Sequence, residues 1–290
     1  ATLADTASVY GPCAGTFGME PWHESLYDAF GILTGEKAAA QSGNIGVSVE
    51  TDAGKEDAVR KSEERTVKQP DGGERTEKQP DGGRIVGETD RRQACGGTAA
   101  REAAGDRVTL GGYAGWEKES LKGAENPLAP YHLTETRTLR TYVGREQVSS
   151  VPAFSGRLLG GCLDCLVNLL GTRFDRTREF VERYQEDGII WFLEACDLNV
   201  FSIRRAMWQM EEAGWLKHVK GFLIGRPLNG APMMNLDACG AVLEVAGRKN
   251  VPVVMDVDLG HLPPMMPLVV GSMADVTVKG NDTRIEMRFV

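Results

Sequence analysis

The feature that most constrains this chain is a set of short, uninterrupted apolar runs in its C-terminal half. The runs are GIIWFL, GFLIG and VPVVMDV, which begin at Gly188, Gly221 and Val251. A run of this length without polar alternation is typical of a strand that is buried on both faces. Helical signals separate the runs: Asn199 can cap a helix that extends through Ala213, and a second helix is expected over 236–246. Strands separated by helices predict βαβ units, so we expect an α/β fold with a mostly parallel sheet and flanking helices.

Weaker patterns flank these runs. Apolar residues at helical spacing predict a helix from Cys162 to Leu170, which the chain would enter through Gly160 and Gly161. Residues 24–33 have the pattern of an amphipathic helix, and the tail, with LVVGSMADVTVKG and TRIEMRFV, alternates as expected for two closing strands.

Composition divides the chain into four parts. Residues 1–38 resemble the tail of a preceding domain, and residues 39–112 are rich in Gly, Glu, Lys, Arg, Asp and Thr with almost no aromatic residues. The second part contains the tandem repeat ERTVKQPDGG and ERTEKQPDGG, and two such short copies cannot build a solenoid core. We therefore expect a disordered, low-complexity insert at 39–112, a connecting segment at 113–150 and the main C-terminal domain at 151–290.

Charge and composition exclude several classes of partner. The formal net charge is -8, which argues against a nucleic acid polymer or an anionic membrane as the partner and favours a peptide or small-molecule substrate. No apolar run approaches the roughly 20 residues that span a bilayer, and six scattered cysteines suit a reducing compartment, so a cytoplasmic location is expected. The pair Cys162 and Cys165 has no second pair at zinc-finger spacing, which favours two thiols on a helix over a metal or redox site.

Two ionisable residues follow strand signals. Glu194 comes directly after IIWFL, and His261 follows VVMDVDLG, so parallel strands would bring both to one edge of the sheet. A carboxylate there can orient an imidazole and stabilise its charged form, although carboxylates at strand ends are commonplace. Asp256, Asp258 and His261 alternatively form a partial metal-site pattern, which the lack of a second nearby histidine weakens. Arg226 either binds a substrate carboxylate or pairs with a neighbouring acid.

Four segments carry a resemblance to a known family. They are SGRLLGGCLDCLVNLLGT, DGIIWFLEACDLN, AGWLKHVKGFLIGRP and VPVVMDVDLGHLPPMMPLVVGS, within about Ser155 to Ser272. Together they resemble the C-terminal half of the LD-carboxypeptidase family of serine peptidases, including its microcin-immunity branch. SVYGPCAGTFGMEPWHESL more weakly resembles the end of the family's N-terminal α/β domain, which makes residues 1–38 a remnant of that domain.

The resemblance implies a two-domain α/β hydrolase with a Ser-Glu-His triad, no metal, no cofactor and usually a homodimer. Its substrates would be murein tetrapeptides from peptidoglycan or, in the immunity branch, peptidyl-nucleotide antibiotics. Glu194 matches the glutamate of the family's LE motif and His261 the histidine of its GH motif. Gly160 and Gly161 match a glycine pair near the substrate.

One family motif is missing. The nucleophilic serine belongs to a Tyr-Ser-Asp motif before the YGP segment, and this sequence contains neither that motif nor a G-x-S-x-G elbow. Ser8, Ser25, Ser155 and Ser272 do not occupy an equivalent position. The expectation is therefore a serine LD-carboxypeptidase-type hydrolase that is incomplete as given, or alternatively a non-catalytic remnant that binds a peptide or a partner chain.

Overall fold

The structure is a computed structural model that describes residues 8–12, 19, 23–34 and 107–289. The chain divides into two compact units, residues 1–40 with 103–290 and residues 41–102. The second unit, with the tandem repeat, lies outside the described residues, as does the predicted insert up to residue 106. No helix in the described ranges is long and apolar enough to cross a membrane.

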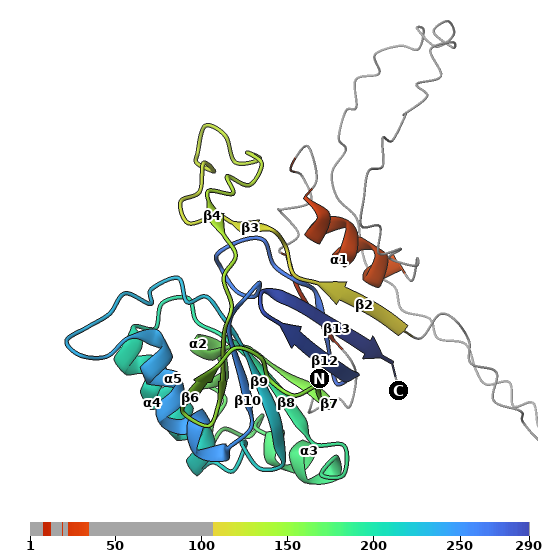
Figure 1. Ribbon diagram of the computed structural model, residues 1–290, viewed down its shortest axis with the longest axis vertical. Coiled ribbons are helices and arrows are strands. Elements are labelled where there is room, and N and C mark those ends of the chain that lie inside the picture. Colours follow the sequence, from red (N-terminus) through yellow and green to blue (C-terminus); the bar gives the residue numbers. More distant parts are fainter. Residues whose placement is uncertain (1–7, 13–18, 20–22, 35–106, 290) are drawn as a thin grey trace, which may run out of the picture. The chain divides into compact units, whose positions relative to one another are not determined.

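A mixed sheet of nine strands forms the centre of the first unit (Figure 1). In spatial order its strands are β2 (Arg107–Gly111), β13 (Asp282–Arg288), β12 (Met273–Lys279), β7 (Phe154–Cys162), β8 (Ile189–Glu194), β9 (Val219–Gly225), β10 (Pro252–Val257), β5 (Arg140–Val143) and β6 (Glu146–Val148). The pairs among β7, β8, β9 and β10 are parallel, and the pairs on both flanks are antiparallel. The α/β class expected from the sequence is confirmed, and parallel pairing is confined to the four central strands.

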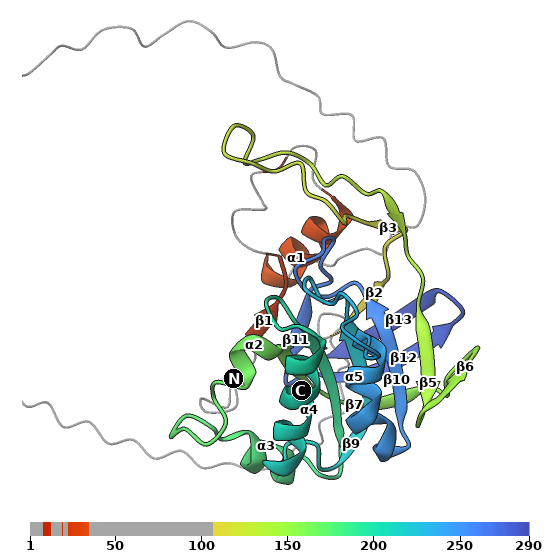
Figure 2. The ribbon, with the colours of Figure 1, turned by 90° about the vertical axis from the view of Figure 1, so that its left-hand side faces the viewer.

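Two small antiparallel pairs complete the strands. β1 (Ser8–Tyr10) pairs with β11 (Leu268–Val270), and β3 (Gly115–Trp116) pairs with β4 (Glu135–Thr136). Figure 2 shows β1 beside β11, so the described part of the N-terminal segment lies against the C-terminal part of the chain. Tyr10, at the end of β1, thereby contacts the ring of Phe192 on β8 at 5.3 Å between ring centroids.

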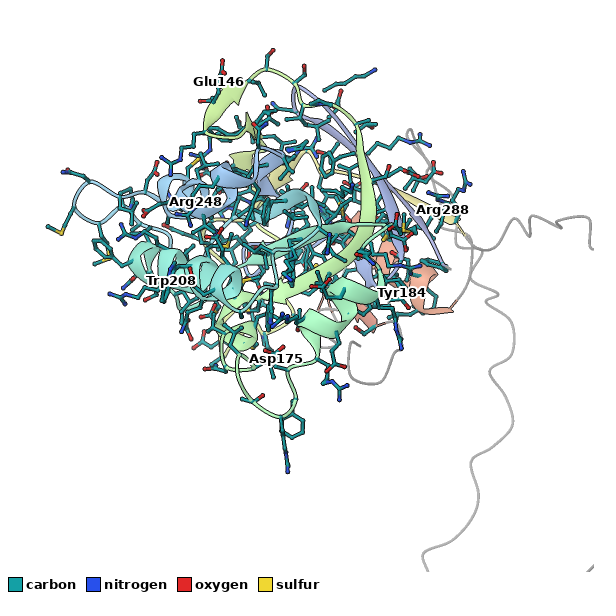
Figure 3. The ribbon with its side chains drawn as sticks, turned by 90° about the horizontal axis from the view of Figure 1, so that it is seen from below. Glu146, Asp175, Tyr184, Trp208, Arg248 and Arg288 are labelled. Atoms are coloured by element: carbon teal, nitrogen blue, oxygen red, sulfur yellow. The ribbon has the colours of Figure 1, made fainter. Side chains whose placement is uncertain are left out.

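The helices are α1 (Glu24–Thr34), α2 (Leu163–Leu166), α3 (Thr177–Arg183), α4 (Val200–Glu212) and α5 (Ala238–Ala246), followed by a 3-10 turn at Gly247–Lys249. α4 and α5 lie together on one face of the parallel strands (Figures 1 and 2). As predicted, Asn199 caps α4 by accepting a hydrogen bond from the N–H of Ser202 at 3.1 Å. Figure 3 labels Trp208 on the outer side of α4, where 53% of it is exposed.

The hydrophobic core is built around β8. All six residues of this strand are buried, and Trp191 stacks on Trp215 with 5.9 Å between ring centroids. A continuous apolar strand between two other strands loses contact with water on both faces, and burial of apolar surface is the dominant favourable term in folding. Glu194, the last residue of β8, is therefore carried by the most deeply buried strand of the sheet.

Three predictions of local structure need correction. The helix predicted from Cys162 to Leu170 ends at Leu166, because the side chain of Asn168 donates to the carbonyl of Asp164 at 2.7 Å and the following turns are i to i+3. Gly160 and Gly161 belong to the nine-residue strand β7, which the sequence did not reveal; β7 ends at Cys162, and α2 begins at the next residue. The range predicted as an insert also includes Arg107–Gly111, which form β2 at the edge of the sheet.

Candidate active site

Glu194 and His261 meet at the carboxyl edge of the parallel strands. The Nδ1 atom of His261 lies 3.0 Å from Oε2 of Glu194, and the glutamate side chain is 1% exposed whereas that of the histidine is 44% exposed. A buried carboxylate that accepts from Nδ1 fixes the tautomer of the ring and leaves Nε2 to exchange a proton. The structure thus brings together the two residues that the sequence placed at one edge of the sheet.

Two glycines allow His261 to reach Glu194. His261 follows β10 and Glu194 ends β8, so the chain after β10 must cross the end of the strand between them, β9. The chain after β10 crosses the end of β9 at Gly225, where a Cβ would lie 2.4 Å from the carbonyl oxygen of Leu259. It then passes Glu194 at Gly260, which has a φ of 100°, and a Cβ there would lie 2.9 Å from Oε2 of Glu194. Any side chain at either position would push the histidine loop away from the glutamate.

Cys162 is a third member of the site that sequence reasoning missed. It is the register partner of Glu194 across the parallel pair β7 and β8. One ligand atom from each of Cys162, Glu194 and His261 lies within 4.8 Å of the others. Burial, followed by the charge of Glu194, raises the pKa of the Cys162 thiol, which favours the protonated form.

Tyr10 encloses the glutamate from the side of β1. Its hydroxyl is buried and lies near the Glu194 carboxylate and the backbone of Gly260. Burial first, and then the charge of Glu194, raises the pKa of this phenol, so it stays protonated. Tyr10 therefore adds a neutral phenol to the surroundings of the carboxylate.

Asp164 fixes the loop that follows Glu194. Its Oδ2 accepts from the N–H of Cys196 at 2.9 Å, and its Oδ1 accepts from the N–H groups of Asp197 and Leu198 at 2.8 and 3.1 Å. Burial alone would raise the pKa of Asp164, but these backbone hydrogen bonds outweigh it and lower the pKa. The ionised carboxylate thus holds the peptide groups immediately after the candidate catalytic glutamate.

The partial metal pattern of Asp256, Asp258 and His261 is not assembled. The carboxylate of Asp256 pairs with Arg140 at 2.7 Å, and Asp258, 1% exposed at its side chain, pairs with Arg226 at 2.7 Å. Both carboxylates are engaged by arginines, and neither joins His261 in a group of possible metal ligands among the described residues. The spacing of these three residues in the sequence does not bring them together in space, because a bulge at Asp256, which has a φ of 66°, changes the direction of the chain.

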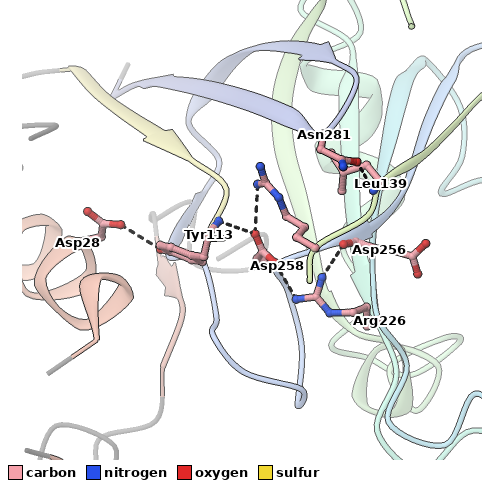
Figure 4. Close-up of polar contacts among 8 residues, drawn as sticks. Asp28, Tyr113, Leu139, Arg226, Asp256, Asp258 and Asn281 are labelled. Atoms are coloured by element: carbon pink, nitrogen blue, oxygen red, sulfur yellow. Dashed lines mark hydrogen bonds and ion pairs between the residues drawn. The ribbon is translucent and has the colours of Figure 1, made fainter. Parts of the chain in front are cut away.

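Asp258 instead belongs to a buried polar network (Figure 4). Its Oδ2 accepts from the N–H of Tyr113 at 2.9 Å, and the hydroxyl of Tyr113 donates to Asp28 of α1 at 2.9 Å. Arg226 also donates to the carbonyl of Asp256 at 2.6 Å. Of the two roles left open for Arg226, the structure shows pairing with a neighbouring acid, Asp258, and contact with a substrate stays a prediction.

A cleft of about 750 Å³ adjoins this network. Its lining includes Trp116, Lys118, Arg140, Arg226 and Leu262, the residue that follows His261. The guanidinium of Arg226 lies 5.0 Å from the centre of the Trp116 ring. The lining also includes Glu119, Glu135 and Asp256, so groups of both charges and an aromatic ring face this concave surface.

The glycine pair expected near the substrate lies beside the three-residue cluster. A Cβ at Gly160 would lie 1.8 Å from the carbonyl oxygen of Phe192, so this position is filled by the neighbouring strand. A Cβ at Gly161 would meet no atom within 4 Å, so this residue borders open space just before Cys162. Only Gly161 is therefore placed where a ligand could approach.

Comparison with known proteins identifies one region of the chain. Residues 155–276 match the family described as LD-carboxypeptidase C-terminal domain. The comparison with curated proteins found no match.

Several solved structures are similar. A muramoyltetrapeptide carboxypeptidase from Oxalobacter formigenes is 22% identical, with 54% of this chain and 51% of that chain covered and a TM-score of 0.40. A MccF-like protein from Streptococcus pneumoniae in complex with AMP is 19% identical, with 62% and 53% covered and a TM-score of 0.47. A MccF-like protein from Bacillus anthracis str. Ames is 18% identical, with 64% and 52% covered and a TM-score of 0.46. This chain spans about half the length of the solved structures that it matches.

The matched region contains β7 to β10, Cys162, Glu194 and His261, and hence the whole cluster at the carboxyl edge of the sheet. Over residues 155–276, the chain carries an LD-carboxypeptidase-like C-terminal domain.

Proposed function

We propose that this chain supplies the acid–base half of a serine-type LD-carboxypeptidase that hydrolyses murein peptides or related peptidyl conjugates. The observation that carries the proposal is the contact between Glu194 and His261 at 3.0 Å, inside the matched domain. The buried glutamate would hold Nδ1 of the ring, and Nε2 would accept the proton of a nucleophile and return it to the leaving amine. The nucleophilic serine would come from a domain outside these 290 residues.

The electrostatics around the pair support this division of roles. Glu194 is buried and in contact with an imidazole ring, and it faces the neutral Tyr10 phenol and Cys162 thiol. No second carboxylate is part of the cluster of possible ligand atoms within the described ranges. A negative charge in such surroundings stabilises the imidazolium that forms when the base takes a proton.

The test uses the full gene product that contains this chain, incubated with a murein tetrapeptide, and measures release of the terminal D-amino acid by mass spectrometry. His261→Ala and Glu194→Gln should each lower turnover on the order of 10⁴-fold, because a triad acts as a unit. His132→Ala is the matched control, since this histidine is exposed and lies outside the cluster. Near-normal turnover by a folded His261→Ala variant would refute the proposal.

A second candidate is a non-catalytic domain that binds a peptide or a partner chain. It is favoured by the observation that no serine hydroxyl of the described residues is hydrogen-bonded to His261. Calorimetric titration of the 290-residue chain with the tetrapeptide separates the two candidates. Binding without hydrolysis, in the full gene product as well, would support the binding domain.

Two further properties belong to the same proposal. The family resemblance favours a homodimer, which sedimentation of the purified chain would test. Six scattered cysteines favour a reducing, cytoplasmic compartment, which fractionation of the source cells would test.

A further inference from the structure

The carboxylate of Glu194 has more hydrogen-bonding capacity than His261 alone can satisfy. Its Oε2 lies 3.0 Å from Nδ1 of His261, and its side chain is 1% exposed, so solvent reaches little of the carboxylate. An ionised carboxylate has two acceptor oxygens with about four lone-pair sites. Burying such a charge is costly unless further donors are present. The protein around Glu194 is therefore expected to supply a donor besides the imidazole.

Tyr10 reaches this carboxylate from a separate part of the chain. β1 pairs with β11 and places Tyr10 opposite Leu268, and the ring of Tyr10 lies 5.3 Å from that of Phe192. Phe192 and Glu194 are two residues apart on β8, so their side chains project from the same face of the strand. The hydroxyl of the Tyr10 ring is buried and lies near the Glu194 carboxylate and the backbone of Gly260.

The Tyr10 hydroxyl is suited to donate to Glu194. Burial, followed by the charge of Glu194, raises the pKa of the phenol, so it keeps its proton. A hydrogen bond from a hydroxyl to a carboxylate is charge-assisted and stronger than one between neutral groups. Unlike an arginine or a lysine, a phenol adds no net positive charge that would repel an imidazolium on the other side of the carboxylate.

We propose that Tyr10 is a positioning residue of this site: its hydroxyl donates to the Glu194 carboxylate and holds it in the orientation that accepts from Nδ1 of His261. Tyr10 lies outside the matched range 155–276, so a strand of the N-terminal segment would set the geometry of a pair that the matched domain carries. The consequence for turnover rests on the proposed function, in which His261 takes the proton of a nucleophile. The contact between the phenol and the carboxylate does not, and it is tested without substrate.

The first measurement is NMR of isotope-labelled histidine in the 290-residue chain at about pH 9, where an ordinary imidazole is neutral. The ring of His261, assigned by its absence from His261→Ala, should carry its proton on Nδ1 in the unaltered chain. In Tyr10→Phe the carboxylate is free to turn, and the ring should become a mixture of both tautomers. Tyr113→Phe is the matched control, because it removes the hydroxyl of another buried tyrosine, which donates to Asp28.

The control variant should leave the tautomer of His261 as it is in the unaltered chain. An unchanged His261 ring in a folded Tyr10→Phe chain, or the same change in both tyrosine variants, would overturn the proposal.

A second measurement covers a Tyr10→Phe chain that does not fold. With tyrosine isotope-labelled at Cζ, Glu194→Ala should shift the resonance of Tyr10, because the phenol loses its acceptor, and should leave that of Tyr113 in place. A Tyr10 resonance that does not move in a folded Glu194→Ala chain would show that the hydroxyl does not donate to this carboxylate.

The third measurement is turnover of a murein tetrapeptide by the full gene product that contains this chain. Tyr10→Phe should lower kcat about 10- to 100-fold and change KM little, since a misoriented base impairs the reaction rather than the binding of substrate. A rise in KM with kcat unchanged would contradict a positioning role. If the unaltered full gene product releases no amino acid, the proposed function fails, and the NMR results still decide whether Tyr10 holds Glu194.

Discussion

Replacing Asp164 with Asn tests whether one carboxylate holds the loop after Glu194. The change keeps the size of the side chain and removes its charge. Asp164 accepts three backbone hydrogen bonds, from Cys196, Asp197 and Leu198, at 2.8–3.1 Å. In the variant, the amide nitrogen would face at least one of these N–H groups and could not accept from it.

The cost follows from the hydrogen bonds that are lost. A hydrogen bond to a charged group contributes about 1.5–3 kcal/mol, and partial exposure of Asp164 places this case toward the lower end, so we expect Asp164→Asn to cost about 2 kcal/mol. For a domain of this size, that corresponds to a fall of about 4–8 °C in Tm. Urea unfolding followed by circular dichroism measures the free energy of unfolding at pH 7.

The stability that Asp164 contributes should depend on pH in a direction set by its pKa. The pKa of Asp164 is lowered from its ordinary value of 3.8 in the folded state. The stability due to its ionised form is therefore fully present above the unfolded pKa and is lost as the pH falls through the lower folded pKa. The difference between the unaltered chain and Asp164→Asn should be constant near neutral pH and should shrink below about pH 4.

Asp197→Asn is the matched control for this experiment. Asp197 is exposed in the same loop, and within the described residues its carboxylate accepts a hydrogen bond from the thiol of Cys196 alone, at 3.7 Å. This variant should stay within about 0.5 kcal/mol of the unaltered chain. An Asp164→Asn variant that unfolds like the unaltered chain at pH 7, or a difference that persists undiminished in acid, would refute the argument.

Three further predictions concern stability. Asp258→Asn should cost about 3–5 kcal/mol in urea unfolding, because it leaves buried arginine charge uncompensated, whereas Asp256→Asn, which breaks a partly exposed pair, should cost no more than about 1 kcal/mol. Equal effects of the two would contradict this account. Asn199→Ala should lower the free energy of unfolding by about 1 kcal/mol through loss of the cap of α4, and an unchanged value would show that the cap contributes nothing. Gly160→Ala should prevent accumulation of folded protein, since its Cβ would overlap the neighbouring backbone, whereas Gly123→Ala, with open space around it, should fold normally by circular dichroism.

The sequence predicted the centre of the fold because local and tertiary preferences agree there. The three apolar runs became β8, β9 and β10, since each is buried on both faces and needs no particular partner to be recognised. The cap at Asn199 and the stop at Gly214 located α4 for the same reason: both act within one turn of the helix.

The strands that flank the centre of the sheet were not predicted from the sequence, because they form by pairing with strands far away in the chain. β7 contains Arg157, and two glycines precede its last residue, Cys162, a pattern that predicts a turn when read alone. It is a strand because β12 pairs with it on one side and β8 on the other. β5 and β6 depend likewise on β10, to which β5 adds as an antiparallel neighbour.

The site residues that follow locally recognisable strands were predicted, and the one that follows a strand dependent on distant partners was missed. Glu194 and His261 follow recognisable strands, so the rule that functional groups gather at the carboxyl edge of a parallel sheet was enough to place them together. Cys162 lies at that edge only because β7 is parallel to β8 and in register with it, which pairs the thiol with Glu194. Once β7 is taken as a helix entrance, Cys162 falls on a helix surface and its neighbour becomes Cys165 instead of the carboxylate. The error in the strand and the missed thiol are thus a single error, and a residue at the end of an unrecognised parallel strand is where further missed site residues should be sought.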